Sequence, residues 1–299
     1  EGIRAGLTYT VYNRAKAESL SRAAERAGKT VKVHIKIDSG MGRIGFRGAE
    51  EESLREIREI AALPGLDLEG IFTHFATADG FDAADPETAG KAYLFRQFER
   101  FKKSIEALEE KGLNFRLRHC CNSPASLLYP EMQLDAVRPG LILYGLLPDN
   151  CPFAGDGLKP LMSLKSRVEQ VKVLKAGETV SYGRRYRAPW DILTATVPIG
   201  YADGYRRVMS GKAEALIGGR RVPQIGTICM DAAIFDVSAL KGRIKEGDEV
   251  VLWGRQGDEE ITAAELAAWQ ESINYEVPCA LSPRIPRIYR RNGKLELPS

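Results

Sequence analysis

Six residues that can bind polar groups or move protons follow short apolar segments in the first half of the sequence. One lies in the glycine-rich stretch HIKIDSGMGRIGF, another in THF, and the rest in CCNS and VRPG. Their side chains and amides offer guanidinium, imidazole, carboxamide, hydroxyl and backbone N–H groups. Together they predict a ligand site if the fold gathers them. The residues are Arg43, His74, Asn122, Ser123, Arg138 and Gly140.

The elements that would position these residues alternate between β-rich runs and amphipathic helical stretches. We expect helices at Ala15 to Ala27, Ala49 to Ala62 and Ala89 to Lys111, each followed by a Gly or Pro stop signal. This rhythm is typical of βαβ units in a parallel sheet. The expected strands lie within Leu7 to Tyr12, Val31 to Asp38, Leu68 to Phe75, Phe115 to Ser123 and Ala136 to Gly145.

The polar residues cluster at the carboxyl ends of these expected strands, with His74 placed inside the third. In a parallel α/β fold the strand ends converge on one face, where ligands bind. Taken singly, a histidine in a strand is more often a satisfied core residue, and an arginine often caps a structural element. Five elements that end alike favour a site.

Composition narrows the class of protein. The chain has 299 residues, 44% apolar and 28% charged, with a formal net charge of +3, so we expect no nucleic-acid and no membrane partner. No run is apolar enough to span a bilayer, and no secretory signal pattern is seen. The five cysteines have no metal-ligand spacing, and we expect no metal site and a cytoplasmic location.

The second half of the sequence changes to short β-rich segments separated by Gly, Pro and charged turns, which is typical of a mainly-β domain. We therefore expect a (β/α) domain over residues 1–156 and a β-domain over residues 157–299, joined by a hinge at Gly155 to Pro160. One helix is expected within the β region at Thr262 to Ser272, because Thr262 and Glu265 have capping-box spacing.

Eight motifs in order give the chain a family resemblance: IKIDSGMGRIGF, THFATAD, HCCNSPASLLYP, VRPGLILYG, VSYGRRY, PIGYADGY, GTICMDAA and INYEVPCALSPRIPRIY. Together they resemble alanine racemase, which uses pyridoxal 5'-phosphate. The resemblance implies a (β/α)8 TIM-type barrel followed by a β-domain, in a head-to-tail homodimer whose β-domain contributes to the partner's site. It also implies interconversion of L-alanine and D-alanine by two-base proton transfer at the α-carbon, which supplies D-alanine for peptidoglycan.

The resemblance implies roles for the residues around the cofactor ring. Tyr182 would be one of two catalytic bases, although a phenol with a pKa near 10 needs a nearby positive charge or an equally weak acid as its partner. Arg138 would face the pyridine nitrogen and could not readily give it a proton. His74 and His119 would link Arg138 to Tyr182 through hydrogen bonds.

Further roles concern the cofactor phosphate, the substrate and the entrance. Arg43 would lie near the substrate carboxylate, braced by Lys36, which is carboxylated in many family members. Met230 would contact the substrate, and Tyr201 and Asp231 would support it at the entrance of the partner's site. The remaining cofactor contacts implied are Asn122, Ser123, Gly140, Leu141 and Tyr275.

One expected motif is missing from the sequence. The family's cofactor lysine lies on the first barrel strand, in a stretch that resembles AVVKADAYGHG, and these 299 residues contain no such stretch. By motif order, Leu7 to Tyr12 would be the fourth strand, so we expect an N-terminally incomplete barrel of about the last five strands. The isolated chain is then expected to be inactive. The alternatives are a non-catalytic remnant or assembly fragment, and a racemase of serine or another amino acid.

Overall fold

The structure, a computed structural model, describes residues 1–80, 90–148, 151, 153, 157–291 and 294–296. Its contacts divide the chain into two compact units, centred on Glu1–Leu143 and on Leu158–Ser299 with the short segment that begins at Tyr144. Part of the expected hinge, residues 155 and 156, lies outside the described residues. Among the described helices, none combines the length and the apolar character needed to cross a bilayer.

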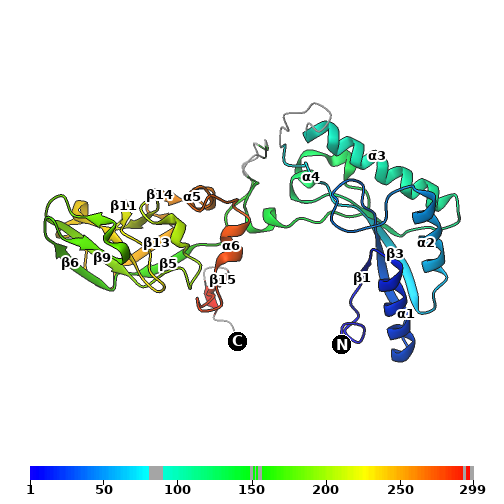
Figure 1. Cartoon of the computed structure of the whole chain (residues 1–299), viewed down its shortest axis with the longest axis horizontal. Helices are drawn as coiled ribbons and strands as arrows, with labels where there is room; N and C mark the ends of the chain where they lie inside the picture. Colours follow the sequence, from blue (N-terminus) through cyan, green and yellow to red (C-terminus); the bar gives the residue numbers. More distant parts are fainter. Residues whose placement is uncertain (81–89, 149–150, 152, 154–156, 292–293, 297–299) are drawn as a thin grey trace. The chain divides into compact units, whose positions relative to one another are not determined.

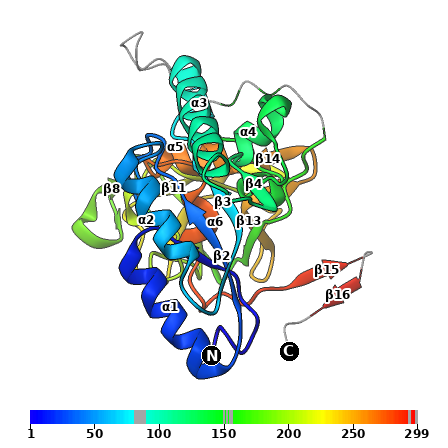
Figure 2. The same cartoon turned by 90° about the vertical axis from the view of Figure 1, so that its right-hand side faces the viewer.

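The first unit is a parallel sheet with helices along one of its faces (Figures 1 and 2). The strand order β1-β2-β3-β4 follows the sequence, as it does when successive βαβ units add at one edge. The strands are β1 (Tyr9–Val11), β2 (Val31–Lys36), β3 (Leu66–Phe72) and β4 (Leu117–His119), and the helices are α1 (Arg14–Ala27), α2 (Glu51–Ala61), α3 (Gly90–Glu109) and α4 (Ser123–Leu128).

Local sequence signals set the ends of these helices, and the apolar face of the sheet packs against them. Asn13 caps α1 by accepting a hydrogen bond from the amide of Lys16, and Gly28 ends the helix at φ 60°. Val33 and Ile35 of β2 are fully buried in a core that also contains Ile57 of α2 and residues of α1 and α3. The alternation of β2 therefore separates an apolar face from a polar one.

The prediction of a fifth strand at Ala136 to Gly145 is wrong. Ala136 forms an isolated bridge with His119, and Leu141–Tyr144 is a 3-10 helix, η2. Pro139 has no N–H to donate to a ladder, which explains why pairing stops after one bridge. The segment still runs beside β4, because Arg138 N donates to Cys121 O at 2.9 Å.

The second unit is built around an eight-stranded antiparallel sheet, which confirms the expected β-rich half. The order is β14-β13-β10-β11-β12-β9-β6, with β5 paired to β13. The strands of this sheet are β5 (Leu164–Arg167), β6 (Gln170–Leu174), β9 (Ile192–Val197), β10 (Glu214–Ile217), β11 (Arg220–Ile225), β12 (Ala233–Asp236), β13 (Glu249–Gln256) and β14 (Glu259–Ile261). The unit also contains two small hairpins, β7 (Thr179–Val180) with β8 (Tyr186–Arg187) and β15 (Tyr289–Arg291) with β16 (Lys294–Glu296), and the helices α5 (Ala263–Trp269) and α6 (Glu276–Ala280).

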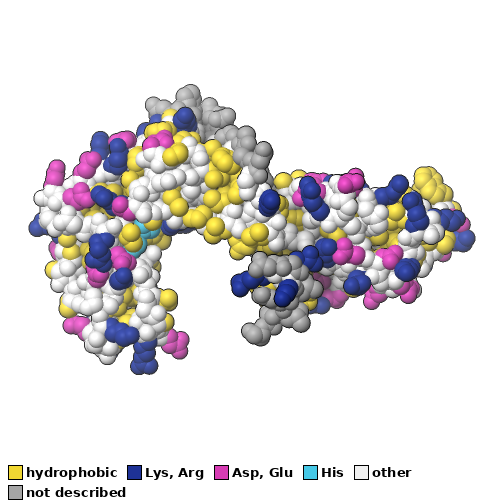
Figure 3. Space-filling model, turned by 180° about the vertical axis from the view of Figure 1, so that it is seen from behind, with side chains coloured by type: hydrophobic (Ala, Val, Ile, Leu, Met, Phe, Trp, Pro, Cys, Tyr) yellow, Lys and Arg dark blue, Asp and Glu magenta, His cyan; other side chains and the backbone are white. Residues whose placement is uncertain are grey.

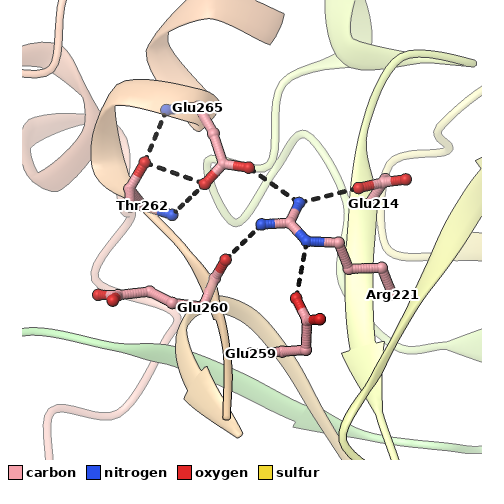
Figure 4. A network of polar contacts seen from close by, with 6 residues as sticks. All are labelled: Glu214, Arg221, Glu259, Glu260, Thr262 and Glu265. Atoms are coloured by element: carbon pink, nitrogen blue, oxygen red, sulfur yellow. Dashed lines mark hydrogen bonds and ion pairs between the residues drawn. The ribbon is translucent and has the colours of Figure 1, made fainter.

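Helix α5 is joined to the sheet through Arg221 of β11 (Figure 4). The guanidinium of Arg221 contacts Glu214 at 2.9 Å, Glu259 at 3.2 Å and Glu265 at 2.8 Å. The predicted capping box is confirmed, because Glu265 N donates to Thr262 Oγ1 and the Glu265 carboxylate accepts from Thr262 N. Hydrogen bonds that Arg221 donates to the carboxylates of Glu265, Glu214 and Glu259 raise its pKa, so the guanidinium stays charged.

Candidate active site

The face of the first unit's sheet that is turned away from the helices carries polar side chains. Along β2 the residues Lys32, His34 and Lys36 alternate with the buried Val33 and Ile35. Histidine atoms of this unit reach the molecular surface beside hydrophobic side chains (Figure 3). A polar face on a parallel sheet needs an explanation, because such sheets are normally buried on both sides.

Arg138 is the centre of the contacts at the carboxyl end of this face. Its Nη1 donates to Nδ1 of His119 at 2.7 Å, and its Nη2 donates to Thr73 O at 2.8 Å, to His74 Nδ1 at 3.3 Å and to Cys120 O at 3.3 Å. Burial lowers the pKa of Arg138. Within the described part of the chain Arg138 takes part in none of the ion pairs, so its charge is available to an anionic ligand.

The two histidines that contact Arg138 are neutral. Burial, with the charge of Arg138, lowers the pKa of His119 to about 3 and that of His74 to about 4. An uncharged imidazole can accept a hydrogen bond from the guanidinium, whereas a protonated imidazole would repel it. His119 is the last residue of β4, and His74 lies two residues beyond β3 instead of inside it, which corrects the expected placement.

Lys36, the last residue of β2, is 2% exposed and donates to Ile37 O at 2.6 Å. Its Nζ lies 5.5 Å from the centre of the Phe72 ring. Burial lowers the pKa of Lys36 to about 8, with smaller effects of Asp38, which raises it, and of Arg138 and Arg43, which lower it. Arg43 is itself exposed, and its charge is felt at Lys36 and at His74.

The loop that carries Arg43 folds back tightly on the end of β2. Phe46 N donates to Lys36 O at 2.9 Å, and Asp38 N donates to Phe46 O at 2.8 Å. Gly45 has φ 129°, and a Cβ there would lie 2.6 Å from Asp38 N and 2.8 Å from Lys36 O. Only glycine fits this close approach, so the glycine-rich sequence is explained by the turn it makes.

The CCNS and VRPG segments meet beside Arg138. Gly140 N donates to Ser123 Oγ at 2.8 Å, and Leu141 begins η2. Asn122 caps α4 by accepting from Ala125 N at 3.2 Å, so its side chain is committed to the local structure. The preceding cysteines, Cys120 and Cys121, are fully buried fillers whose thiols both bond to Met132 O.

The second unit gathers another set of predicted residues. Tyr182 begins the 3-10 helix η3 (Tyr182–Arg184), and its side chain is 70% exposed. Thr227 Oγ1 donates to Tyr182 O at 2.9 Å, and Ser181 Oγ bonds to Thr227 O at 2.5 Å. The neighbouring Ser181 and Gly183 have φ 62° and 75°. These contacts fix the backbone that presents the phenol.

Tyr201 and Met230 lie on the loops that face each other next to this turn. Tyr201 N donates to Cys229 O at 3.1 Å, and Ala202 N donates to Met230 O at 3.1 Å. Gly200 permits this pairing, because a Cβ there would lie 2.3 Å from both carbonyl oxygens. The side chains of Tyr201 and Met230 are exposed.

Two further predicted residues belong to this unit: Asp231 lies in a loop, and Tyr275 lies at the start of a helix. Asp231 forms an ion pair with Arg284 at 2.7 Å. Tyr275 immediately precedes α6 and is partly buried.

Sequence reasoning missed several residues of the polar face. His34 Nδ1 lies 2.8 Å from His119 Nε2, and His34 Nε2 lies 3.3 Å from the carboxylate of Glu69. Phe72 stacks on His119 with ring centroids 4.9 Å apart and also lies under Arg138 at 5.2 Å. A sequence signal existed for His34, because it shares the polar alternation of β2 with Lys36.

Comparison with known proteins covers both units. The sequence matches the family description "Alanine racemase, N-terminal domain" over residues 1–148 and "Alanine racemase, C-terminal domain" over residues 161–289. The chain is 43% identical to the alanine racemase of Desulforamulus reducens over 290 residues, which is 97% of this chain and 75% of that protein. It is 40% identical to that of Clostridium novyi over 294 residues, or 98% and 74% of the two chains.

Solved structures agree with the sequence matches. The alanine racemase of Clostridium difficile 630 superposes with a TM-score of 0.90 at 40% identity, covering 99% of this chain and 74% of that one. The Bacillus anthracis enzyme with bound L-Ala-P gives 0.85 at 36% identity, covering 96% and 72%. These findings confirm the resemblance and the α/β fold with a β-rich second half. The chain belongs to the alanine racemase family.

Proposed function

We propose that this protein interconverts L-alanine and D-alanine with pyridoxal phosphate as its cofactor. As a member of the alanine racemase family it is an amino-acid racemase, and its curated relatives are named as alanine racemases. The observation that carries the proposal is Arg138, a half-buried cation held by neutral histidines, carbonyl groups and the ring of Phe72.

The residues of the first unit suit an anionic, phosphorylated aromatic cofactor. Their donor set consists of a guanidinium, a hydroxyl and loop amides. Pyridoxal phosphate, when bound, would withdraw electrons from the α-carbon of the amino acid and make its proton removable. We propose that Arg138 and His74 contact the ring, and that the phosphate is held by Ser123, Gly140, Leu141 and Tyr275, with Asn122 beside it.

Arg138 would limit the electron demand of the cofactor ring. A guanidinium remains protonated even with a lowered pKa, so it would donate a hydrogen bond to the pyridine nitrogen without transferring a proton. The neutral His119 and His74 hold it by accepting hydrogen bonds. A modest electron sink favours reprotonation of the α-carbon, which racemisation requires, over side reactions.

Tyr182 would exchange the proton at one face of the α-carbon, and a lysine, as in the family, would act on the other. A phenol that both takes and returns the proton suits a reaction that runs in both directions. We propose that Arg43 binds the substrate carboxylate and that Lys36 braces it.

The remaining roles concern the assembly. In a head-to-tail homodimer, the proposed β-domain of residues 157–299 would supply Tyr201, Met230 and Asp231 to the entrance of the site in the partner's 1–156 domain. The exposed side chains of Tyr201 and Met230 support such a role. All five cysteines are free, which supports a reducing, cytoplasmic location.

The test joins this chain to the family's cofactor-lysine stretch, loads the protein with pyridoxal phosphate, incubates it with L-alanine and measures D-alanine by chiral chromatography. L-serine and L-lysine are assayed in parallel, because the small pocket that Met230 and the entrance tyrosines would form favours alanine. Faster turnover of serine or lysine would reject alanine as the substrate. Absence of racemisation, with cofactor binding demonstrated by absorbance, would reject the activity.

A further inference from the structure

Four side chains form a continuous hydrogen-bonded line across the polar face of the first unit's sheet. Arg138 Nη1 lies 2.7 Å from His119 Nδ1, and His119 Nε2 lies 2.8 Å from His34 Nδ1. His34 Nε2 in turn lies 3.3 Å from Glu69 Oε2. The line leads from Arg138, the proposed cofactor contact, to the carboxylate of Glu69 in the middle of β3.

The donors and acceptors in this line can be arranged in one way. Arginine has no acceptor, so Arg138 must donate, and His119 must accept at Nδ1. Because His119 is neutral, its single proton lies on Nε2, from which it donates to His34 Nδ1. His34 therefore carries its proton on Nε2 and donates it to Glu69, which as a carboxylate only accepts.

Two features of the backbone make this line possible. The pairing of β2 with β3 runs Val33 to Leu68 and then His34 to Gly70, so Glu69 is the extra residue of a β-bulge, which re-aims its side chain. A Cβ on Gly70 would lie 2.7 Å from the imidazole of His34. Glycine at this position leaves the space through which His34 reaches across β3 to His119 on β4.

We propose that Glu69 and His34 are positioning residues, which fix the tautomer of His119 and thereby hold Arg138 in the orientation needed at the cofactor ring. A carboxylate directly on Arg138 would neutralise it, whereas a carboxylate three hydrogen bonds away orients it and leaves its charge for the ligand. The orienting role deepens the proposed function and rests on it, but the tautomers do not.

The tautomers can be read from long-range proton–nitrogen correlations of the imidazole rings in histidine-labelled protein without cofactor. The sequence has three histidines, so the spectrum is simple. We expect a proton on Nε2 and none on Nδ1 in both His34 and His119, as the line of hydrogen bonds requires. A proton on Nδ1 of either ring would overturn the proposal.

The variant Glu69→Gln tests whether the carboxylate of Glu69 decides which nitrogen of His34 carries the proton. Lys32 contacts Glu69 at 2.6 Å and Arg116 lies at 3.6 Å, and these donors would keep the carboxamide oxygen and turn its NH2 toward His34. We expect the His34 proton to move to Nδ1. The matched control Lys32→Gln removes the cation from the same carboxylate and should leave both rings unchanged. Identical spectra for the two variants would overturn the proposal.

Kinetics of the chain joined to the family's cofactor-lysine stretch and loaded with pyridoxal phosphate then separate positioning from general stability. Glu69→Gln should lower kcat about tenfold with little change in KM, as is common for partners that orient a contact residue, whereas Lys32→Gln should not. Unchanged kcat in Glu69→Gln would overturn the positioning role. If Glu69→Gln does not fold, His34→Gln serves instead, because its amide can accept from His119 and donate to Glu69. It should then retain the Nε2 proton of His119, and loss of that proton would overturn the proposal.

If no variant and no wild type racemises alanine while the tautomers are as expected, the proposed function fails and the assignment of the tautomers stands.

Discussion

Nη1 of Arg138 donates to Nδ1 of His119 across 2.7 Å, and both groups lie against the same aromatic ring, Phe72. The stack is nearly parallel, with an angle of 5° between the rings of His119 and Phe72. Aromatic packing of this kind restricts the imidazole, and the imidazole restricts the guanidinium. A flexible cation is thus held as a fixed donor.

Replacement of Arg138 by lysine should keep the positive charge but lose the pair of nitrogens, Nη1 and Nη2, that donate to different acceptors. A compact ammonium lacks the two separate nitrogens in a fixed plane by which Nη1 reaches His119 and Nη2 reaches Thr73 O. We expect kcat/KM to fall about 100-fold in steady-state racemisation assays. The control Arg118→Lys changes an arginine of β4 that pairs with Asp135 on the surface, and it should have little effect. Equal losses in the two variants would contradict the role of Arg138.

Stability of the first unit should fall as the solution is acidified below pH 6.5. The pKa values of His119 and His74 in the folded chain, about 3 and about 4, lie below the ordinary value. The unfolded chain therefore binds protons first, and each histidine costs about 2 kcal/mol by pH 5. Hydrogen exchange of peptides from β2 and β4 at pH 7, 6 and 5 measures this loss.

His74→Gln removes one of the two titrating rings and should flatten this pH dependence by about half. Protection that stays constant between pH 7 and pH 5 in the wild type would show that neither imidazole is held neutral.

Lys36 should bind carbon dioxide as a carbamate at mildly alkaline pH. Its pKa of about 8 leaves roughly half of the amine neutral at pH 8, and the neutral amine is the nucleophile. The resulting negative charge would be attracted to Arg43 and Arg138. Carbon-13 NMR in labelled bicarbonate should show a carbamate signal that disappears in Lys36→Gln and persists in Lys172→Gln. A signal that survives in Lys36→Gln would assign the reaction to another lysine.

Gly45→Ala should distort the loop that carries Arg43. The new methyl group would lie 2.6 Å from Asp38 N at φ 129°, so the backbone must move, at a cost of about 2 kcal/mol. Gly42→Ala in the same loop is the matched control, since φ is 72° and no atom lies within 4 Å of its Cβ position. Its cost should be about 1 kcal/mol. Thermal unfolding and the KM for alanine should both separate the two variants.

Local sequence signals predicted most of the fold. The strand within Val31 to Asp38, the Gly stop signal after the helix that ends at Ala27 and the capping box at Thr262 depend on neighbouring residues, and each has the predicted form. The fifth strand was wrong because Ala136 to Gly145 is apolar enough for a strand, while Pro139 prevents the pairing that defines one. The apolar pattern of that segment favours a strand, but a strand also needs ladder hydrogen bonds, and Pro139 cannot donate one.

The polar face was harder to predict from sequence because its contacts join distant strands. His34 and His119 are 85 residues apart, and each alone has the pattern of a core histidine. Their meeting depends on the bulge at Glu69 and on the missing side chain of Gly70, which are properties of strand register. Motif similarity indicated Arg138 and His119, and alternation along β2 could place His34 on the polar face, but only pairing of the strands shows that it meets His119.

Gly70 is a member of the line of contacts without contributing any atom to it. The imidazole of His34 occupies the volume that any larger residue at position 70 would claim. A single added methyl group there would displace the His34 ring. Glu69, His119 and Arg138 would all still be present, but the hydrogen bonds that join them would be broken. Inspection of the polar residues alone would then find nothing altered in a damaged enzyme.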